Sequence, residues 1–185
     1  MKSRFLFSLA SVGLCAALLG ITGCNGGGDD DVDDSTTTGG LPGTWRLNGA
    51  TITAPLVGDN ASLLTLAGLT PSGDTVSVNS STLSLFGVAA TLIIDEDGTW
   101  SLQVTIPGLP GYTTAGTYAA EGTYTLSGNR ITLTITSIPS GGADIAEVGD
   151  TFTISYSQSG NALDLSATSA DTGVPGTAIM INLTR

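Results

Sequence analysis

Apolar and polar residues alternate with a period of two through most of the chain after residue 98. The run from Thr99 to Ile106 is the clearest example, because an apolar side chain occupies every second position. Successive side chains of a β-strand point to opposite faces, so this pattern predicts strands with one buried face. Further runs extend the prediction to strands near residues 44–53, 75–79, 82–86, 89–95, 99–106, 116–126, 130–137, 151–157, 162–168 and 177–184. One short helix is expected within Ala61–Leu69, where several leucines precede Pro71.

Short turn motifs separate the later runs, and each contains a glycine, which adopts positive φ without strain. These motifs are Asp97-Gly98, Ser127-Gly128-Asn129, Ser159-Gly160-Asn161 and Pro175-Gly176. Antiparallel neighbours joined by such turns form a meander, and closing the meander hides its exposed edges. We therefore predict an all-β fold over residues 41–185, an antiparallel up-and-down meander of about eight to ten strands that closes into a barrel.

The first 23 residues have the order of a secretory signal. Lys2 and Arg4 precede an apolar run from about Phe5 to Ile21, which ends in small residues and a cysteine. Serine and glycine interrupt the run, whereas a membrane-spanning helix needs roughly 20 predominantly apolar residues. The pattern favours a signal peptide over a membrane-spanning segment.

The sequence Ile21-Thr22-Gly23-Cys24 resembles the lipobox of bacterial lipoprotein signal peptides. The resemblance implies that residues 1–23 are removed and that Cys24 is acylated, with palmitate as a candidate fatty acid. Two or more acyl chains hold a protein stably on a membrane. The implied location is the cell envelope, and Asn25, in place of a retention aspartate, favours the outer membrane, on its periplasmic or surface face. An ordinary cleaved signal and an uncleaved anchor are the alternatives.

Residues 25–40 consist almost entirely of glycine, aspartate, serine and threonine, and Val32 is their only large apolar side chain. Such a segment buries too little apolar surface to offset the entropy lost on ordering. We expect residues 24–40 to be a lipidated, acidic and disordered tether. Calcium binding or a sorting role for the aspartates is the alternative.

Composition limits the chemistry of the remaining chain. After residue 23 it keeps three arginines and all sixteen acidic residues, a formal charge of −13. Such a surface repels phosphate, which excludes nucleic acid as a partner. Histidine is absent from the sequence, and lysine and cysteine are absent after residue 24. We therefore expect no cofactor, no metal site and no enzyme activity, with a carboxylate-based hydrolase as the remaining enzymatic alternative.

Gly43-Thr44-Trp45 resembles the Gly-x-Trp motif that opens the first strand of lipocalins. The stretches Ile94–Trp100 and Gly122–Leu133 are similar to those of bacterial lipocalin-like, calycin-type domains of envelope lipoproteins. By this resemblance Trp45 packs at the closed end of the barrel beneath an arginine, for which Arg185 is the candidate. The cysteine pairs of lipocalins are absent. The resemblance implies a barrel that carries or sequesters a small apolar molecule.

The inward rows of the predicted strands contain no ionisable side chain, so a cavity between them would favour an apolar ligand. The candidate ligand-binding residues are Trp100, Leu102, Val104, Tyr124, Leu133, Phe152 and Ile154. The apolar loop 106–112 is either a lid or contact surface at the barrel mouth or packs across an open end. A structural or protein-interaction module of the cell envelope, without a small-molecule ligand, is the alternative function.

Two acidic stretches have both a chemical and a structural interpretation. Asp95-Glu96-Asp97-Gly98 begins like a calcium loop, but a strand follows where a full loop would continue to a closing glutamate, so we predict a charged hairpin turn. Asp144, Glu147 and Asp150 could supply a carboxylate pair for glycoside hydrolysis, but nothing in the sequence fixes their geometry.

Overall fold

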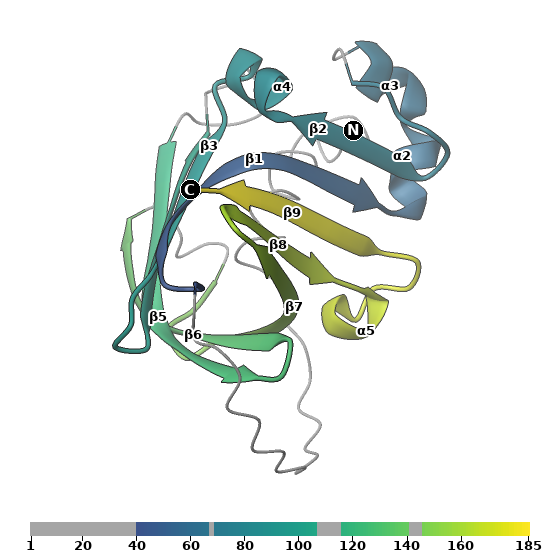
Figure 1. Ribbon diagram of the computed structural model, residues 1–185. Helices are drawn as coiled ribbons and strands as arrows, with labels where there is room; N and C mark the ends of the chain where they lie inside the picture. The colour runs from purple at the N-terminus through teal and green to yellow at the C-terminus, as the bar shows by residue number, and fades with distance from the viewer. Residues whose placement is uncertain (1–39, 67–68, 107–115, 141–145) are drawn as a thin grey trace.

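The computed structural model describes residues 40–66, 69–106, 116–140 and 146–185. They form one antiparallel sheet in the order β2-β1-β3-β4-β5-β6-β7-β8-β9 (Figure 1). The strands are β1 (Gly43–Thr53), β2 (Thr75–Asn79), β3 (Ala89–Ile94), β4 (Thr99–Ile106), β5 (Gly116–Ser127), β6 (Arg130–Ser140), β7 (Thr151–Ser159), β8 (Ala162–Ala167) and β9 (Ala178–Thr184).

The sheet closes because β1 pairs with strands from both ends of the meander. Residues Gly43–Arg46 of β1 pair with β3, and Arg46–Thr53 pair with β9. Eight strands therefore form a closed barrel, and β2 is an extra strand along the second half of β1. Closure satisfies the backbone groups that an open sheet would leave unpaired at its edges. The predicted all-β up-and-down barrel is confirmed.

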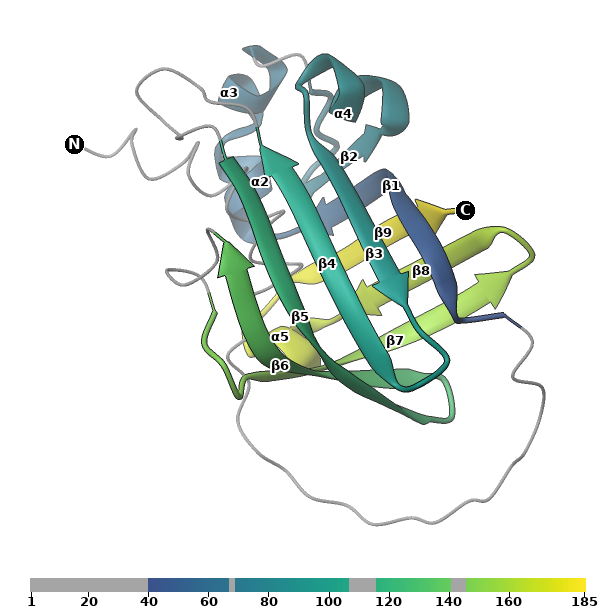
Figure 2. The same ribbon diagram turned by 90° about the vertical axis from the view of Figure 1, so that its left-hand side faces the viewer.

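The two ends of the barrel differ in the length of their connections. At one end, here called the turn end, glycine turns join β3 to β4, β5 to β6 and β7 to β8. Gly98, Gly128 and Gly160 in these turns have positive φ angles of 85°, 55° and 56°. Gly176, in the β8–β9 connection at the other end, has a φ angle of 73°. The opposite end, here called the loop end, carries the longer connections (Figure 2). The four predicted glycine turns are confirmed.

Four short helices occur in the described part of the chain, all in loop-end connections. They are α2 (Pro55–Asp59), α3 (Ala61–Leu66), α4 (Ser80–Leu85) and α5 (Ser169–Thr172). The helix α3 lies within the predicted helical stretch, of which residues 67–68 fall outside the described residues. Within those residues, no helix has both the length and the apolar character needed to cross a membrane.

The predicted strand at residues 82–86 is wrong, because most of this stretch belongs to α4. Leu83 and Leu85 alternate with polar residues, which resembles a strand pattern. The side chain of Asn79 instead caps a helix, accepting a hydrogen bond of 2.9 Å from a backbone amide of the first turn. The helix packs Leu83 against Ala50 and leaves Leu85 exposed. Tertiary packing thus separates two leucines that a strand would place on one face.

The inner faces of the barrel strands form one hydrophobic cluster. Its largest fully buried side chains are Trp45, Ile94, Val104, Ile131, Ile135 and Leu163. Among the described residues no polar or charged residue is buried, as the alternating pattern predicts for the inward rows. Threonine and serine occupy outward positions, where pairs such as Thr132 and Thr153 approach across neighbouring strands to 2.8 Å between hydroxyl oxygens.

Candidate functional site

Trp45 and Arg185 cover the turn end of the barrel. The Trp45 side chain is fully buried, and its Nε1 donates a hydrogen bond of 2.8 Å to the carbonyl oxygen of Leu41. Cζ of Arg185 lies 4.4 Å from the centroid of the Trp45 ring, which allows a cation–π contact. The same guanidinium donates hydrogen bonds to backbone carbonyls in residues 40–42 and in the β7–β8 turn. These contacts join the start of β1 to the end of β9 across this end of the interior.

Gly43 allows Arg185 to approach the backbone before Trp45. Its φ of 149° lies in a region that side chains rarely adopt, and a Cβ at this position would lie 3.1 Å from Nη1 of Arg185. Glycine removes both the strain and the crowding. The contact with Arg185 therefore explains why glycine occupies the position two residues before Trp45.

The candidate ligand-binding residues lie on β4 to β7, on the inner surface of the barrel. Trp100, Leu102, Val104, Leu133 and Phe152 are buried members of the hydrophobic cluster, and Tyr124 and Ile154 are partly buried against it. The register places Leu133 directly opposite Tyr124 on one side and Phe152 on the other. The structure thus brings these candidates together on one continuous apolar surface.

Some inward side chains of β4, β6 and β7 keep a little exposure, whereas others are completely buried. Trp45 and Leu163, close to the turn end, are 0% exposed. Leu102, Leu133 and Phe152, further along their strands, keep 6%, 8% and 8%. The exposure does not rise steadily towards the loop end, because Val104 and Ile135 are 0% and 1% exposed.

The loop end carries exposed apolar side chains. Of the candidate lid 106–112, only Ile106 belongs to the described residues, and it pairs with Gly116 where β4 and β5 end. On other loop-end connections, Leu85, Val148 and Val174 are 83%, 64% and 54% exposed. The connections at this end therefore present apolar surface to solvent.

Trp100 packs against the backbone of β5. Its Nε1 donates a hydrogen bond of 2.9 Å to the carbonyl oxygen of Thr123. A Cβ on Gly122 would lie 2.8 Å from this nitrogen. The indole therefore has a fixed position that depends on the missing side chain of Gly122.

The acidic sequence Asp95–Gly98 forms the β3–β4 hairpin turn. Oδ1 of Asp97 accepts hydrogen bonds from the hydroxyl and the backbone amide of Thr99, at 2.6 and 3.0 Å, and these bonds lower the pKa of Asp97. The Tyr124 hydroxyl donates to the carbonyl oxygen of Asp95 at 2.9 Å, and burial together with the acidic charges of the turn raises the pKa of Tyr124. Throughout the described ranges, no three acidic, histidine or cysteine residues gather as metal ligands.

The second acidic stretch is described only in part, because Asp144 lies outside the described residues. Oδ2 of Asp150 accepts a hydrogen bond of 2.9 Å from the backbone amide of Glu147. The Asp150 carboxylate therefore has a structural role in this turn.

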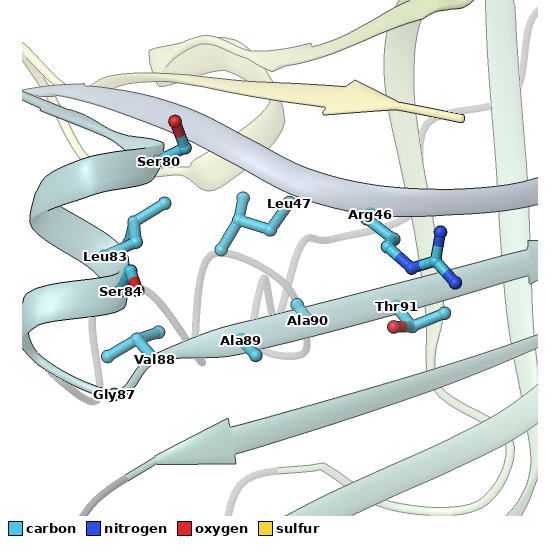
Figure 3. Close-up of a pocket in the computed structure, with 10 residues that line it drawn as sticks. All are labelled: Arg46, Leu47, Ser80, Leu83, Ser84, Gly87, Val88, Ala89, Ala90 and Thr91. Atoms are coloured by element: carbon cyan, nitrogen blue, oxygen red, sulfur yellow. The ribbon is translucent and has the colours of Figure 1, made fainter.

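A pocket lies in the barrel wall where β1 separates from β3, and is here called the seam pocket. It has a volume of about 430 Å³. Figure 3 shows the residues that line it. It is lined by Arg46, Leu47, Ser80, Leu83, Ser84, Gly87, Val88, Ala89, Ala90 and Thr91. The sequence pattern does not reveal this pocket, because its lining comes from strands and a helix that only tertiary folding brings together. Arg46 is the one residue of the lining that the sequence could have singled out, because it is a cation at an outward strand position in an acidic chain.

The strand order defines the architecture of the barrel. Eight antiparallel strands that close in up-and-down order have the architecture of a lipocalin-like barrel. The interior of a barrel of this size is filled by its own side chains or holds one small ligand.

No family model and no curated protein matches the chain. Among solved structures, it is similar to a lipocalin-like protein from Bacteroides uniformis, with a TM-score of 0.40 and 16% identity, over 78% of this chain and 97% of that one. It is also similar to an uncharacterized protein from Bacteroides eggerthii, with a TM-score of 0.40 and 12% identity, over 79% of this chain and all (100%) of that one.

Proposed function

We propose that the barrel binds one small, uncharged and apolar molecule, which enters from the loop end. The observation that supports this proposal is an apolar inner surface that is covered at one end. Trp45 and Arg185 cover the turn end, whereas Leu102, Leu133 and Phe152 on the inner surface keep 6–8% exposure. The inner surface is apolar throughout the described residues, so burial of a ligand there would gain about 25 cal/mol per Å² of apolar area.

The ligand would contact Trp100, Leu102, Leu133 and Phe152. A charged ligand is disfavoured inside the barrel, because no buried counter-charge lies on the described inner surface. The proposed function is carriage or sequestration without a cofactor, a metal or an enzymatic reaction. Nucleic acid is not a partner in this proposal.

Tryptophan fluorescence tests the proposal on residues 25–185, after circular dichroism has established that they fold. Titration with neutral alkyl alcohols or terpenoids should give saturable, one-to-one changes in emission. Replacing Leu133 with Ala should weaken binding by roughly threefold or more, since the ligand loses apolar contact area.

Leu126 is the matched control, because it lies on the adjacent strand β5 and its side chain is 44% exposed. Leu126→Ala should leave the affinity unchanged. Absence of saturation with every neutral probe, or equal effects of the two substitutions, would refute ligand binding inside the barrel.

A protein-interaction module of the cell envelope is the second candidate function. The observation in its favour is that Leu85, Val148 and Val174, on three loop-end connections, are each exposed and so accessible to a partner. The fluorescence titration separates the two functions, since an interaction module without a ligand gives no saturable response.

The proposed location is the cell envelope, with Cys24 acylated and holding the protein on the outer membrane. The lipobox-like sequence ending at Cys24 supports this location. Metabolic labelling with radioactive palmitate should label the wild-type protein in the membrane fraction, and Cys24→Ser should abolish both label and anchoring.

Cys15→Ser is the matched control, because Cys15 lies within the proposed signal peptide and should leave with it. This variant should be labelled like the wild type. A wild-type protein that is cleaved but carries no fatty-acid label would rule out the lipoprotein assignment.

A further inference from the structure

The seam pocket forms because β1 follows two different neighbours. Its first residues pair with β3, but beyond Arg46 it pairs with β2 and β9. The helix α4 and the residues after it cover the space that opens between β1 and β3 (Figure 3). Leu83 of this helix packs against Ala50 of β1. The pocket is therefore a feature of the barrel wall, and it meets the inner hydrophobic cluster only at Ala90 and Leu47.

Arg46 is the arginine without an internal partner in the described part of the chain. Arg130 forms an ion pair of 2.5 Å with Asp171, and Arg185 stacks on Trp45 and binds backbone carbonyls. For Arg46, the described residues provide neither a hydrogen bond nor an ion pair. Its guanidinium donors are therefore available to a ligand, and a guanidinium matches the geometry of carboxylate and phosphate oxygens.

The pocket has a polar end and an apolar middle. Arg46 and Thr91 lie opposite each other on β1 and β3, and Leu47 points into the space beyond them (Figure 3). Val88 and Leu83 continue the apolar lining towards α4. None of the lining residues is acidic, although the chain as a whole carries a formal charge of −11.

We propose that the seam pocket binds a small anionic amphiphile, with a carboxylate or phosphate head at Arg46 and a short apolar tail along Leu47 and Val88. A volume of about 430 Å³ lies within the usual range of small-molecule sites and suits a molecule with a short tail. The tail is required for binding, because the acidic protein repels a free anion at long range. This site has a different chemistry from the uncharged interior and does not depend on the ligand proposed there.

The test uses the full-length chain in lipid nanodiscs, with empty nanodiscs to correct for partitioning. Equilibrium dialysis measures the binding of octanoate, octyl phosphate, octanol and acetate. Octanoate and octyl phosphate should bind and acetate should bind least, and octanol, which the barrel interior also accepts, is the neutral reference. Arg46→Gln should weaken the two anionic amphiphiles by roughly threefold to tenfold, the range expected for an accessible guanidinium contact, and leave octanol unchanged.

Two further variants act as controls. Arg46→Lys keeps the charge and should retain most of the affinity. Gln103→Ala alters an exposed side chain opposite Thr91 that does not line the pocket, and should have no effect. Loss of octanol and octanoate binding to the same extent in Arg46→Gln would overturn the proposal.

Photocrosslinking gives the location of the bound anion. A medium-chain carboxylate with a diazirine in its tail should label residues 80–91, as mapped by mass spectrometry. Label confined to Leu102, Leu133 or Phe152 would overturn the seam site while leaving the interior site standing. Conversely, label on residues 80–91 in a protein that binds no neutral probe would support the seam site and refute the interior one.

Discussion

Replacing Trp45 with alanine should lower the free energy of unfolding by about 4 kcal/mol, the size expected for a fully buried tryptophan. The indole is 0% exposed, and its loss leaves a cavity beneath Arg185. The substitution also removes the hydrogen bond to the Leu41 carbonyl oxygen. In a domain of this size, the loss should reduce Tm by about 8–16 °C in a melt followed by circular dichroism.

Two variants separate the contributions to this effect. Trp45→Phe keeps most of the buried area but loses the indole donor, and should cost about 1–2 kcal/mol. In the Trp45→Ala background, Arg185→Ala should cost less than it does alone, because the cation–π contact is already absent. A loss below about 1 kcal/mol for Trp45→Ala would show that the turn end does not depend on this side chain.

Gly122→Ala should destabilise the barrel by about 3 kcal/mol or more, through crowding between β5 and β6. An added Cβ would lie 1.8 Å from the carbonyl oxygen of Thr134 and 2.8 Å from Nε1 of Trp100. The first contact is with backbone, so a change of side-chain rotamer cannot relieve it. The β5–β6 register also shifts next to Gly122, which brings the two backbones close together there.

Gly116→Ala is the matched control on the same strand. A Cβ there would meet the ring of Tyr118 at 3.5 Å, an ordinary contact. This variant should unfold within about 0.5 kcal/mol of the wild type in urea, whereas Gly122→Ala should shift the midpoint strongly. Similar midpoints for the two variants would contradict the proposed crowding.

Much of the strand and turn pattern could be predicted from local sequence. The alternation in β4 and the glycine turns at 98, 128 and 160 each depend on a few neighbouring residues, so they can be predicted from local sequence. Residues 82–86 also alternate with a period of two, but most of them form the helix α4 and not the predicted strand. There the packing of Leu83 on Ala50 and the cap at Asn79 determine the conformation.

Of the two candidate sites, the inner surface could be predicted from the sequence and the seam pocket could not. The inward positions of Trp100, Leu102 and Leu133 follow from alternation alone, and their contact in one cluster follows once the strands close. The seam pocket could not be predicted, because Arg46 and Thr91 become neighbours only through the β1–β3 pairing.

Most strands, the turns and the apolar character of the inner face follow from the sequence pattern, since each depends on residues close together in the chain. The pairing of β1 with both β3 and β9, the contact of Arg185 with Trp45 and the need for glycine at position 122 arise only in the folded barrel. These three features depend on contacts between segments that are distant in the sequence. Their geometry is set by the closure of the whole sheet.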